Sequence, residues 1–369
     1  MKIGILGSGQ LGRMLALAGY PLGHTFTFFD TAPNSATSDL GATTLATFDD
    51  HTALGAFVAA CDVVTYEFEN VPYQAALTIN AHVPVYPPAR ALKVSQDRVI
   101  EKEFLQGLGI ATPAFLAVSS EAELRAACLT LGTPCIVKTR RLGYDGKGQV
   151  RINSQGDIAG AWRELSGAPL IVEGFIPFTR ELSVIAVRSI DGTVLTYPLV
   201  QNVHRSGILH RSETPAPEVT QELEAAAYKI AATVLQELQY VGVIAIELFD
   251  VDGELLVNEL APRVHNSGHA TIDGVITSQF ENHIRAITGT ALGSVEPRSR
   301  SVMYNLVGTL PDLSRLTALP NAKLHLYGKE PRAGRKLGHV TLLNPSQRDE
   351  QTLEQLLGGV SVAVVNPTS

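Results

Sequence analysis

Several features are scarce in this chain of 369 residues, and each scarcity excludes a class of protein. The 3 cysteines, Cys61, Cys128 and Cys135, lie in apolar contexts without C-x-x-C spacing, which predicts reduced, buried thiols rather than a disulfide framework. No stretch of about 18 uninterrupted apolar residues is present, which argues against a transmembrane helix. The short apolar start, residues 1–7, runs into a glycine turn and lacks the features of a signal peptide. We therefore expect a cytoplasmic protein that does not enter a membrane.

Positive charge is also in short supply, because the formal net charge is −7. This balance argues against a nucleic-acid-binding protein that relies on a broad basic surface, so local basic clusters are candidate sites for small anions. Apolar residues make up 45% of the chain and charged residues 18%, which indicates a well-packed globular protein. A chain of this length is too long for one typical core, and we expect two or three domains.

The order of the expected elements divides the chain into three parts. Residues 1–95 alternate short apolar strands with helices, which predicts a parallel sheet covered on both faces. Residues 96–294 contain two expected hairpins, one turning at Asp191-Gly192 and the other at Asp252-Gly253, between long helices. Residues 295–369 carry short apolar runs and predict a small β-rich domain. We expect Ser95 to cap a helix over 96–107, and Ser120 to begin a helix over 120–131.

The most informative stretch is a glycine-rich, basic run that follows a buried-looking strand. Residues 140–149 read RRLGYDGKGQ, and Lys138 lies in the preceding strand. The glycines leave little side-chain bulk, so the backbone can approach a ligand closely. Together with Lys138 and Lys147, the loop N–H groups predict a cradle for phosphates, although the run lacks the G-x-x-x-x-G-K-[ST] pattern of a Walker loop. A bare glycine-rich hairpin is the alternative.

Two acids in the second expected hairpin lie among apolar residues. Glu247 is flanked by the strand VIAI and by Leu248 and Phe249, and Glu259 follows Asn258 on the neighbouring strand. An acid in such surroundings needs a cation or a proton, and carboxylates facing across a hairpin repel unless a metal bridges them. The pattern predicts a Mg²⁺ site, with a solvent-facing acid pair as the alternative.

The N-terminal glycine turn is open to two interpretations. Residues 7–12 read GSGQLG after a strand and before a helix, and Asp30 ends the second strand, which matches the dinucleotide fingerprint. The alternative is a tight turn whose helix N-terminus holds another anion. The acidic loop EFEN at 67–70 follows a later strand and is a candidate for contacting a substrate, or a solvated loop.

Three further groups of residues are candidates for anion chemistry. Glu173 and Glu181 follow Lys138 at a spacing at which a hinge and a carboxylate could contact a nucleoside, although an ordinary strand end fits equally well. Arg263 is suited to stabilise charge on a transferring phosphoryl group. His265 and His269 are spaced like a zinc pair but have no accompanying third ligand. A dense basic turn, the last group, contains Lys329, Arg332, Arg335, Lys336 and His339.

In this order, the motifs resemble those of the ATP-grasp superfamily, and more closely the 5-(carboxyamino)imidazole ribonucleotide synthetases of purine biosynthesis. The matching stretches span almost the whole chain and are GSGQLGRM at 7–14, EFEN at 67–70, GYDGKGQ at 143–149, VNELAPRVHNSGH at 257–269 and YGKEPRAGRKLGHV at 327–340. The resemblance implies an α/β and α+β architecture with a Rossmann-like pre-ATP-grasp domain, a central ATP-grasp unit and a small β-rich C-terminal domain.

The resemblance also implies roles for individual residues. Glu247 and Glu259 match the ligands of Mg²⁺, for which Mn²⁺ is a possible substitute. The catalytic candidates are Arg263, Lys336, Asp145 and Lys147. Positions that match nucleotide contacts are Arg98, Lys138, Gly143, Tyr144, Asp145, Gly146, Lys147, Gly148, Gln149, Glu173, Phe175, Ile176, Glu181, His204, Asn258 and Glu259. Positions that match ribonucleotide contacts are Glu67, Tyr144, Asp145, Lys329, Arg335 and Lys336.

The expected activity is that of an ATP-dependent carbon–nitrogen ligase, which joins bicarbonate to the amine of 5-aminoimidazole ribonucleotide through carboxyphosphate. A homodimer whose product passes to a mutase is also implied. Two rivals remain: another ATP-grasp ligase or formate-using transformylase on the same scaffold, and a nicotinamide-dependent dehydrogenase using residues 7–12. The dehydrogenase leaves Glu247, Glu259 and the basic loops without a role.

Overall fold

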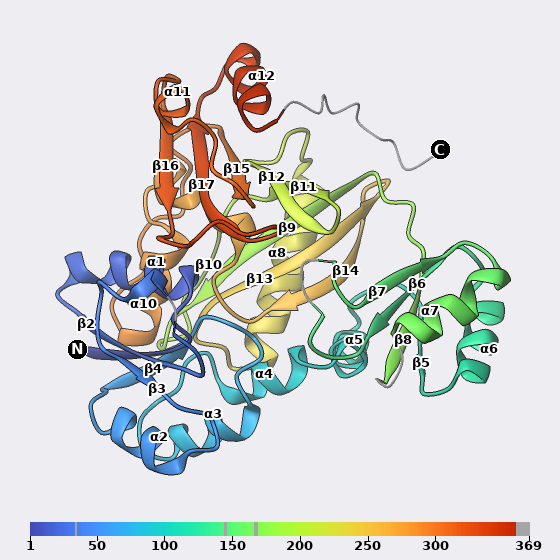
Figure 1. Ribbon diagram of the computed structural model, residues 1–369, viewed down its shortest axis with the longest axis horizontal. Coiled ribbons are helices and arrows are strands. Elements are labelled where there is room, and N and C mark those ends of the chain that lie inside the picture. Colours follow the sequence, from blue (N-terminus) through green and yellow to red (C-terminus); the bar gives the residue numbers. More distant parts are fainter. Residues whose placement is uncertain (34, 144–145, 166–168, 359–369) are drawn as a thin grey trace.

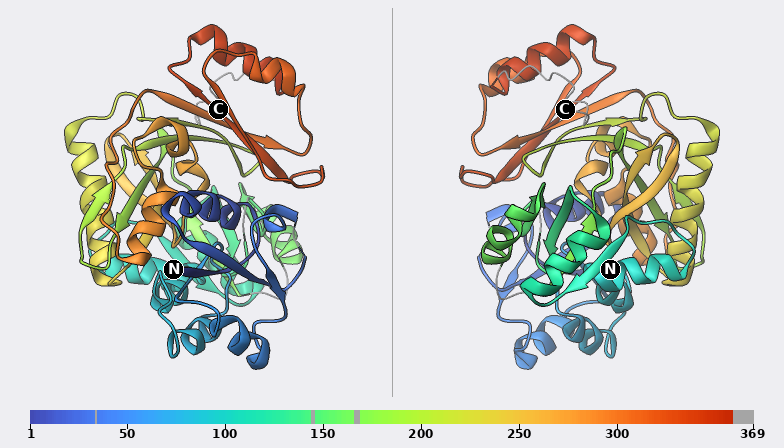
Figure 2. Two further views of the ribbon diagram at one scale, coloured as in Figure 1. Left: turned by 90° about the vertical axis from the view of Figure 1, so that its left-hand side faces the viewer. Right: turned by 90° about the vertical axis from the view of Figure 1, so that its right-hand side faces the viewer.

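The structure, a computed structural model, describes residues 1–33, 35–143, 146–165 and 169–358. Its strands form three sheets, and the largest crosses the middle of the molecule in Figure 1. The blue N-terminal unit and the green lobe with β5 to β8 lie beside this sheet, and the red C-terminal strands are part of it (Figures 1 and 2). None of the helices formed by the described residues combines the length and the apolar character that crossing a bilayer requires.

The N-terminal unit is built on a four-stranded parallel sheet, as predicted. Its strands are β1 (Lys2–Leu6), β2 (Thr25–Asp30), β3 (Thr43–Leu45) and β4 (Val63–Tyr66), in the order β3-β2-β1-β4. Its helices are α1 (Gln10–Gly19), α2 (His51–Val58) and α3 (Tyr73–Asn80), with short 3₁₀ turns at Tyr20–Leu22 and Ser35–Thr37. Alternate residues of β1 enter different cores: Ile3 and Ile5 pack on one face and Leu6 on the other. The first of these cores also contains Phe280 and Ile284, so this unit shares its packing with the central one.

Two helices lead from this unit into the centre, α4 (Ala89–Ser95) and α5 (Arg98–Gly107). The prediction that Ser95 caps the second helix is wrong, because Ser95 is the last residue of α4 and its hydroxyl donates to the Ala91 carbonyl oxygen. Asp97 is the cap instead, since its carboxylate accepts a hydrogen bond from the Val99 N–H at 3.1 Å. The same carboxylate also receives two hydrogen bonds from Arg140, each 2.9 Å long.

A small lobe follows, with an antiparallel sheet in the order β5-β8-β6-β7. Its elements are β5 (Phe115–Val118), α6 (Glu121–Leu131), β6 (Cys135–Thr139), β7 (Gln149–Ile152), a 3₁₀ turn at Gln155–Asp157, α7 (Ile158–Glu164) and β8 (Leu170–Gly174). The helix predicted over 120–131 is α6, and Ser120 is its cap rather than its first residue, because the Ser120 hydroxyl accepts from the Glu123 N–H. The loop between β6 and β7 contains the glycine-rich run, of which Tyr144 and Asp145 lie outside the described residues.

The largest sheet has nine strands among the described residues, and eight of them follow the order β14-β13-β9-β11-β12-β15-β17-β16. The strands are β9 (Arg180–Arg188), β10 (Val194–Thr196), β11 (Val200–Arg205), β12 (Ile208–Thr214), β13 (Gly242–Val251), β14 (Glu254–Ala261), β15 (Ser301–Val307), β16 (Ala322–Leu326) and β17 (Lys336–Leu343). The helices are α8 (Gln221–Glu237), α9 (Thr271–Gly274), α10 (Gln279–Thr288), α11 (Leu313–Thr317) and α12 (Gln347–Leu356), and a 3₁₀ turn covers Asn266–Gly268. Both predicted hairpins, β9–β10 and β13–β14, are confirmed.

The C-terminal strands continue the central sheet instead of forming a separate one. Strand β15 pairs antiparallel with β12, and β17 lies between β15 and β16. Because Lys336 is the first residue of β17, this continuity places it in the same sheet as the central strands. The domain limits of 95 and 294 remain predictions.

Candidate active site

One cleft of about 580 Å³ collects side chains from all three parts of the chain. Most of the predicted site residues line it: Glu67, Arg98, Lys138, Gly143, Gly146, Lys147, Gln149, Glu181, His204, Glu247, Asn258, Glu259, Arg263, Lys329 and Lys336. Gly148, Glu173, Phe175, Ile176 and Arg335 are not among its lining residues. The candidates Tyr144 and Asp145 lie outside the described residues.

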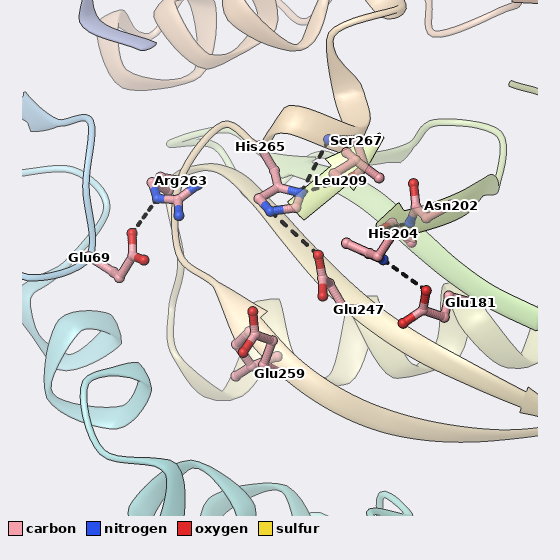
Figure 3. A network of polar contacts seen from close by, with 12 residues as sticks. Glu69, Glu181, Asn202, His204, Leu209, Glu247, Glu259, Arg263, His265 and Ser267 are labelled. Atoms are coloured by element: carbon pink, nitrogen blue, oxygen red, sulfur yellow. Dashed lines mark hydrogen bonds and ion pairs between the residues drawn. The ribbon is translucent and has the colours of Figure 1, made fainter. Parts of the chain in front are cut away.

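The two acids of the second hairpin face each other as predicted. Strands β13 and β14 pair Glu247 with Glu259, next to a bulge in the ladder, and Figure 3 shows both carboxylates on the same side of the hairpin. Burial, followed by repulsion from Glu259, raises the pKa of Glu247 to about 7. A divalent cation would remove this repulsion and leave both acids ionised.

The residues present suit such a cation bound together with phosphates. The side-chain oxygen Oδ1 of Asn258, next to Glu259, is buried and has no hydrogen-bond partner among the described residues. Among the described residues, no three His, Cys, Asp or Glu side chains gather closely enough to hold a metal alone. Two carboxylates that need further oxygens from phosphate and water match the ligand preference of Mg²⁺. Zinc held by His265 and His269 is not supported.

His265 lies beside the acid pair as a neutral ring. Its Nε2 is 3.5 Å from Glu247 Oε1, and its Nδ1 is 2.9 Å from the Ser267 hydroxyl (Figure 3). Burial, with the neighbouring Arg263 and Lys336 charges, holds the pKa of His265 well below its usual range. The ring is therefore a polar neighbour of the carboxylates and adds no positive charge.

Arg263 joins the central unit to the acidic loop of the N-terminal unit. Its Nε donates to Glu69 Oε2 at 2.5 Å, and its Nη1 donates to the Val264 carbonyl oxygen at 3.1 Å (Figure 3). Burial acts to raise the pKa of Glu69, but attraction to Arg263 outweighs it and the pKa is lowered. The guanidinium is thereby fixed at the edge of the cleft, in contact with the loop EFEN.

A buried carboxylate satisfies the lysine of strand β6. Lys138 Nζ donates to Glu173 Oε2 at 2.8 Å, which confirms the expectation that this lysine needs an anionic partner. The second oxygen of Glu173 lies 3.3 Å from Nζ of Lys102, a fully buried residue of α5. The sequence reasoning placed Lys102 only on a polar helix and missed this contact, because nothing in the local pattern marks a pairing between residues 102 and 173.

Arg98 fastens the beginning of the glycine-rich loop. It donates to the carbonyl oxygens of Thr139 at 3.2 Å and Gly143 at 3.1 Å, and its Nη2 lies 3.8 Å from Glu259 Oε2. Further along the loop, a Cβ on Gly146 would stand 2.8 Å from the Cα of Gly207 in the turn between β11 and β12. Because real Cβ atoms do not approach so closely, only glycine allows this contact across the cleft.

On the opposite side of the acid pair, His204 and Glu181 form a hydrogen bond of 2.8 Å (Figure 3). Burial acts to lower the pKa of His204, but Glu181, Glu247 and Glu259 outweigh it and raise the pKa to about 9. His204 is therefore a cation at neutral pH. Phe175, just beyond β8, packs under the guanidinium of Arg151, whose Cζ is 4.3 Å from the ring centroid.

The N-terminal glycine turn already contains an anion supplied by the chain itself. Glu67 is buried, and its carboxylate accepts hydrogen bonds from the N–H groups of Gly9 and Gly12, the latter at 2.6 Å. Asp30 accepts from the N–H and hydroxyl of Ser8 at 2.9 and 2.6 Å. These two acids occupy the groups that a dinucleotide would use, which rules out the dehydrogenase interpretation of residues 7–12.

The basic C-terminal turn contributes two lysines to the cleft. Lys329 donates to the side-chain oxygen of Gln10 at the start of α1, and Lys336 lines the cleft from the first position of β17. Arg335 instead donates to the carbonyl oxygen of Glu330 at 3.2 Å.

Two residues that the sequence reasoning did not select also line the cleft. Asn266 is buried, and within the part of the chain that the structure describes neither its amide nitrogen nor its amide oxygen has a hydrogen-bond partner. Glu101 is buried on α5 and accepts from the Leu260 N–H at 2.9 Å, and burial followed by repulsion from Glu259 raises its pKa to about 8. Asn266 lies within the motif 257–269, so the motif itself was its available signal.

Models of three families match successive parts of the chain. Residues 1–96 match a ribonucleotide synthetase preATP-grasp domain, residues 103–280 an ATP-grasp domain, and residues 301–354 a phosphoribosylaminoimidazole carboxylase C-terminal domain. These matches confirm the predicted three-domain fold class.

Whole-chain relatives agree with these matches. The chain is similar to an N5-carboxyaminoimidazole ribonucleotide synthase of Pseudomonas aeruginosa, with 48% identity over 342 residues that cover 93% of this chain and 94% of the relative. A synthase of the same name from Bacillus subtilis is 37% identical over 359 residues, covering 96% and 94% of the two chains.

The fold of this chain is also similar to solved structures of the same enzymes. The structure of N5-carboxyaminoimidazole ribonucleotide synthetase from Thermus thermophilus superposes with a TM-score of 0.92 at 46% identity and covers 98% of this chain and 99% of that one. An Aspergillus clavatus synthase in complex with ADP and 5-aminoimidazole ribonucleotide superposes with a TM-score of 0.89 at 33% identity, covering 96% and 97%. The chain belongs to the N5-carboxyaminoimidazole ribonucleotide synthase family of the ATP-grasp superfamily.

Proposed function

We propose that this protein catalyses the ATP-dependent carboxylation of 5-aminoimidazole ribonucleotide with bicarbonate, giving N5-carboxyaminoimidazole ribonucleotide, ADP and phosphate. The family supports this activity, and one observation of the structure carries it. The acid pair Glu247 and Glu259 shares a single cleft with Lys138, Arg263 and Lys336. Such a cleft suits a triphosphate with its metal on one side and small anions on the other.

In the first step, a bicarbonate oxygen attacks the γ-phosphorus of ATP, the bond to the β-phosphate oxygen breaks, and carboxyphosphate and ADP form. Glu247 and Glu259 would hold Mg²⁺, or Mn²⁺ in its place, which when bound neutralises phosphate charge. Lys138 and the glycine-rich loop bind the phosphates, with Arg98 holding the beginning of that loop.

In the second step, the amine nitrogen of the ribonucleotide attacks the carboxyl carbon, phosphate leaves, and the nitrogen loses a proton. We assign Arg263 and Lys336 to stabilise the carboxyphosphate, aided by the unpaired amide of Asn266, because all three line one cleft. Glu67, Lys329 and Arg335 are proposed to contact the ribonucleotide, and Asp145, outside the described residues, to accept or orient the amine proton. A closed loop over 143–149 would exclude the water that hydrolyses carboxyphosphate.

The nucleoside half of ATP is assigned to the side of the cleft formed by the small lobe and β9. Glu181 and His204 line the cleft there, and Phe175 and Ile176 follow β8 directly. We also propose a cytoplasmic location, which the three buried free thiols favour, a homodimer, and transfer of the product to a mutase.

A coupled assay for ADP tests the proposal. With ATP and Mg²⁺, ADP release should require both bicarbonate and 5-aminoimidazole ribonucleotide. ADP release that continues when either is left out, or that formate supports in place of bicarbonate, would contradict the carboxylation proposed here.

A further inference from the structure

Three side chains on one face of helix α5 contact three consecutive residues of strand β14. Arg98 lies 3.8 Å from the carboxylate of Glu259, Glu101 accepts from the Leu260 N–H at 2.9 Å, and Lys102 donates to the Asn258 carbonyl oxygen at 3.2 Å. Residues at i, i+3 and i+4 share a helix face, so these contacts form without distortion. Lys102 is the innermost of the three, since it has no exposed surface.

Lys102 also contributes to an uneven arrangement of charges. The Glu173 carboxylate has one oxygen 2.8 Å from Lys138 Nζ and the other 3.3 Å from Lys102 Nζ. One buried anion therefore has two cationic partners, although one is enough to neutralise it. The Glu173 oxygen nearer to Lys102 makes no geometrically good hydrogen bond, so its contact with Lys102 is mainly an attraction between charges.

The two lysines differ in their access to the cleft. The side chain of Lys138 is 13% exposed and lines the cleft, whereas that of Lys102 is 1% exposed and is not among the lining residues. Lys138 can therefore turn toward a ligand without crossing packed atoms. Lys102 is enclosed between α5, β8 and β14 and cannot follow it.

We propose that Lys102 is the permanent counter-ion of Glu173, and that it allows Lys138 to leave Glu173 for the phosphates of a bound nucleotide. This inference rests on the proposed nucleotide site. Lys102 is a positioning residue that acts through Glu173 and never touches the substrate. Without it, the nucleotide would gain Lys138 only by leaving a buried carboxylate unpaired, which is costly.

The test starts with Lys102→Met, which removes the charge and nearly keeps the length of the side chain. Glu173 still has Lys138 in this variant, so the nucleotide-free protein should fold. Calorimetric titration should show the Kd for Mg-ADP rising by about tenfold or more, and the KM for ATP rising more than kcat falls. Lys93→Met, which removes an exposed lysine of α4, is the matched control and should bind Mg-ADP like the parent.

The double variant Lys102→Met/Glu173→Gln separates this role from a purely structural one. With Glu173 neutral, Lys138 has no carboxylate to leave unpaired, so adding Lys102→Met to Glu173→Gln should change the Kd by less than about threefold. If Lys102→Met raises the Kd as much in the Glu173→Gln background as in the parent, Lys102 acts through its contact with Asn258, and the proposal is overturned.

The variant Lys102→Arg keeps the test valid if Lys102→Met fails to fold. This variant keeps a positive charge beside Glu173, so its Kd for Mg-ADP should stay within about threefold of the parent value. A rise of about tenfold or more in the folded Lys102→Arg protein would overturn the proposal, because the charge would be present and the affinity lost. If the unaltered protein binds no Mg-ADP, the proposed function fails, whereas equal binding by the parent and Lys102→Met contradicts this inference alone.

Discussion

Two regions of this molecule look like anion sites in the sequence, and they differ in whether the chain fills them itself. At the N-terminal turn, the N–H groups of Gly9 and Gly12 bind the Glu67 carboxylate. In the central cleft, Glu247 and Glu259 face each other, and no described residue is a hydrogen-bond partner of the Asn258 oxygen beside them. A helix N-terminus attracts an anion both in a nucleotide site and in a contact between parts of one chain. The glycine motif at residues 7–12 alone therefore does not identify the anion.

The electrostatic consequences of the two regions also differ. Burial raises the pKa of Glu67, and the hydrogen bonds from the backbone N–H groups of Gly12 and Gly9 limit the rise. Burial raises the pKa of Glu247 to about 7 and the second acid, Glu259, adds to the effect. The first site is complete in the folded chain, whereas the second gains stability when a cation arrives.

The largest expected effect is a loss of activity when an acid of the central cleft is changed. Glu259→Gln should lower ADP formation by roughly 10³-fold or more, because it removes a metal ligand from the phosphoryl-transfer site. The thermal melting curve of the variant should match that of the parent. Glu254→Gln, an exposed acid on the same strand, is the control and should keep full activity. Full turnover of Glu259→Gln at low Mg²⁺ would show that the ligand assignment is wrong.

The next effect concerns the basic side of the cleft. Lys336→Ala should slow the coupled carboxylation by about 10²-fold, since it removes a charge that stabilises carboxyphosphate, while the affinity for Mg-ADP changes little. The measurement is the rate of ribonucleotide carboxylation, with ADP release followed in parallel. Lys323→Ala, on the exposed part of β16, serves as control. An unchanged coupled rate in Lys336→Ala would remove this residue from the mechanism.

A smaller effect tests whether the N-terminal turn is filled. Glu67→Ala leaves the Gly9 and Gly12 N–H groups without their acceptor, so the free energy of unfolding should fall by about 1–3 kcal/mol. Inorganic phosphate should then raise the melting temperature of the variant by a few degrees more than that of the parent, because only in the variant are the Gly9 and Gly12 N–H groups open to an anion. Equal stabilisation of both proteins by phosphate would contradict the account of a filled turn.

The smallest effect concerns the contact between the N-terminal unit and the central unit. His283 of α10 lies 2.8 Å from the Thr65 hydroxyl of β4 and accepts from the Val243 N–H, and burial lowers its pKa to about 3. Between about pH 3 and pH 6.5 the unfolded chain therefore binds a proton at this residue that the folded chain does not. Stability should fall as the pH falls through this window.

The measurement is the pH dependence of chemical denaturation. His283→Asn should reduce the slope below pH 6.5 by about 1.4 kcal/mol per pH unit, the value for one proton. His82→Asn, at an exposed position, should leave the slope unchanged. A parent protein whose stability does not change between pH 6.5 and pH 5 would contradict the assignment of a buried neutral ring.

Much of the fold was predictable from local pattern. The hairpins β9–β10 and β13–β14 were predicted because apolar strands flank Asp-Gly turns, and the helix predicted over 120–131 is α6. Ser95 was misassigned because Asp97, two positions later, is an equally good cap and also gains the Arg140 bond. Local sequence does not show which of two nearby capping residues begins the helix when a side chain distant in the sequence favours one of them.

The sequence predicted those site residues that lie in a recognisable motif. It did not predict contacts between residues that are far apart in the chain. The facing of Glu247 and Glu259 followed from one hairpin. The contacts of Glu67 with Gly9 and of Lys102 with Glu173 join residues far apart in the chain, and no periodicity shows them. The continuation of the central sheet into β15 likewise depends on strand pairing across domains.

A crystal structure with Mg-ADP and 5-aminoimidazole ribonucleotide bound tests the central claim most directly. We predict a metal ion between Glu247 and Glu259, the Lys138 ammonium at the phosphates while Glu173 stays with Lys102, and Glu67 still seated on the N–H groups of Gly9 and Gly12. A nucleotide bound at residues 7–12 with Glu67 displaced, and with the two acids of the hairpin away from any metal, would contradict the account.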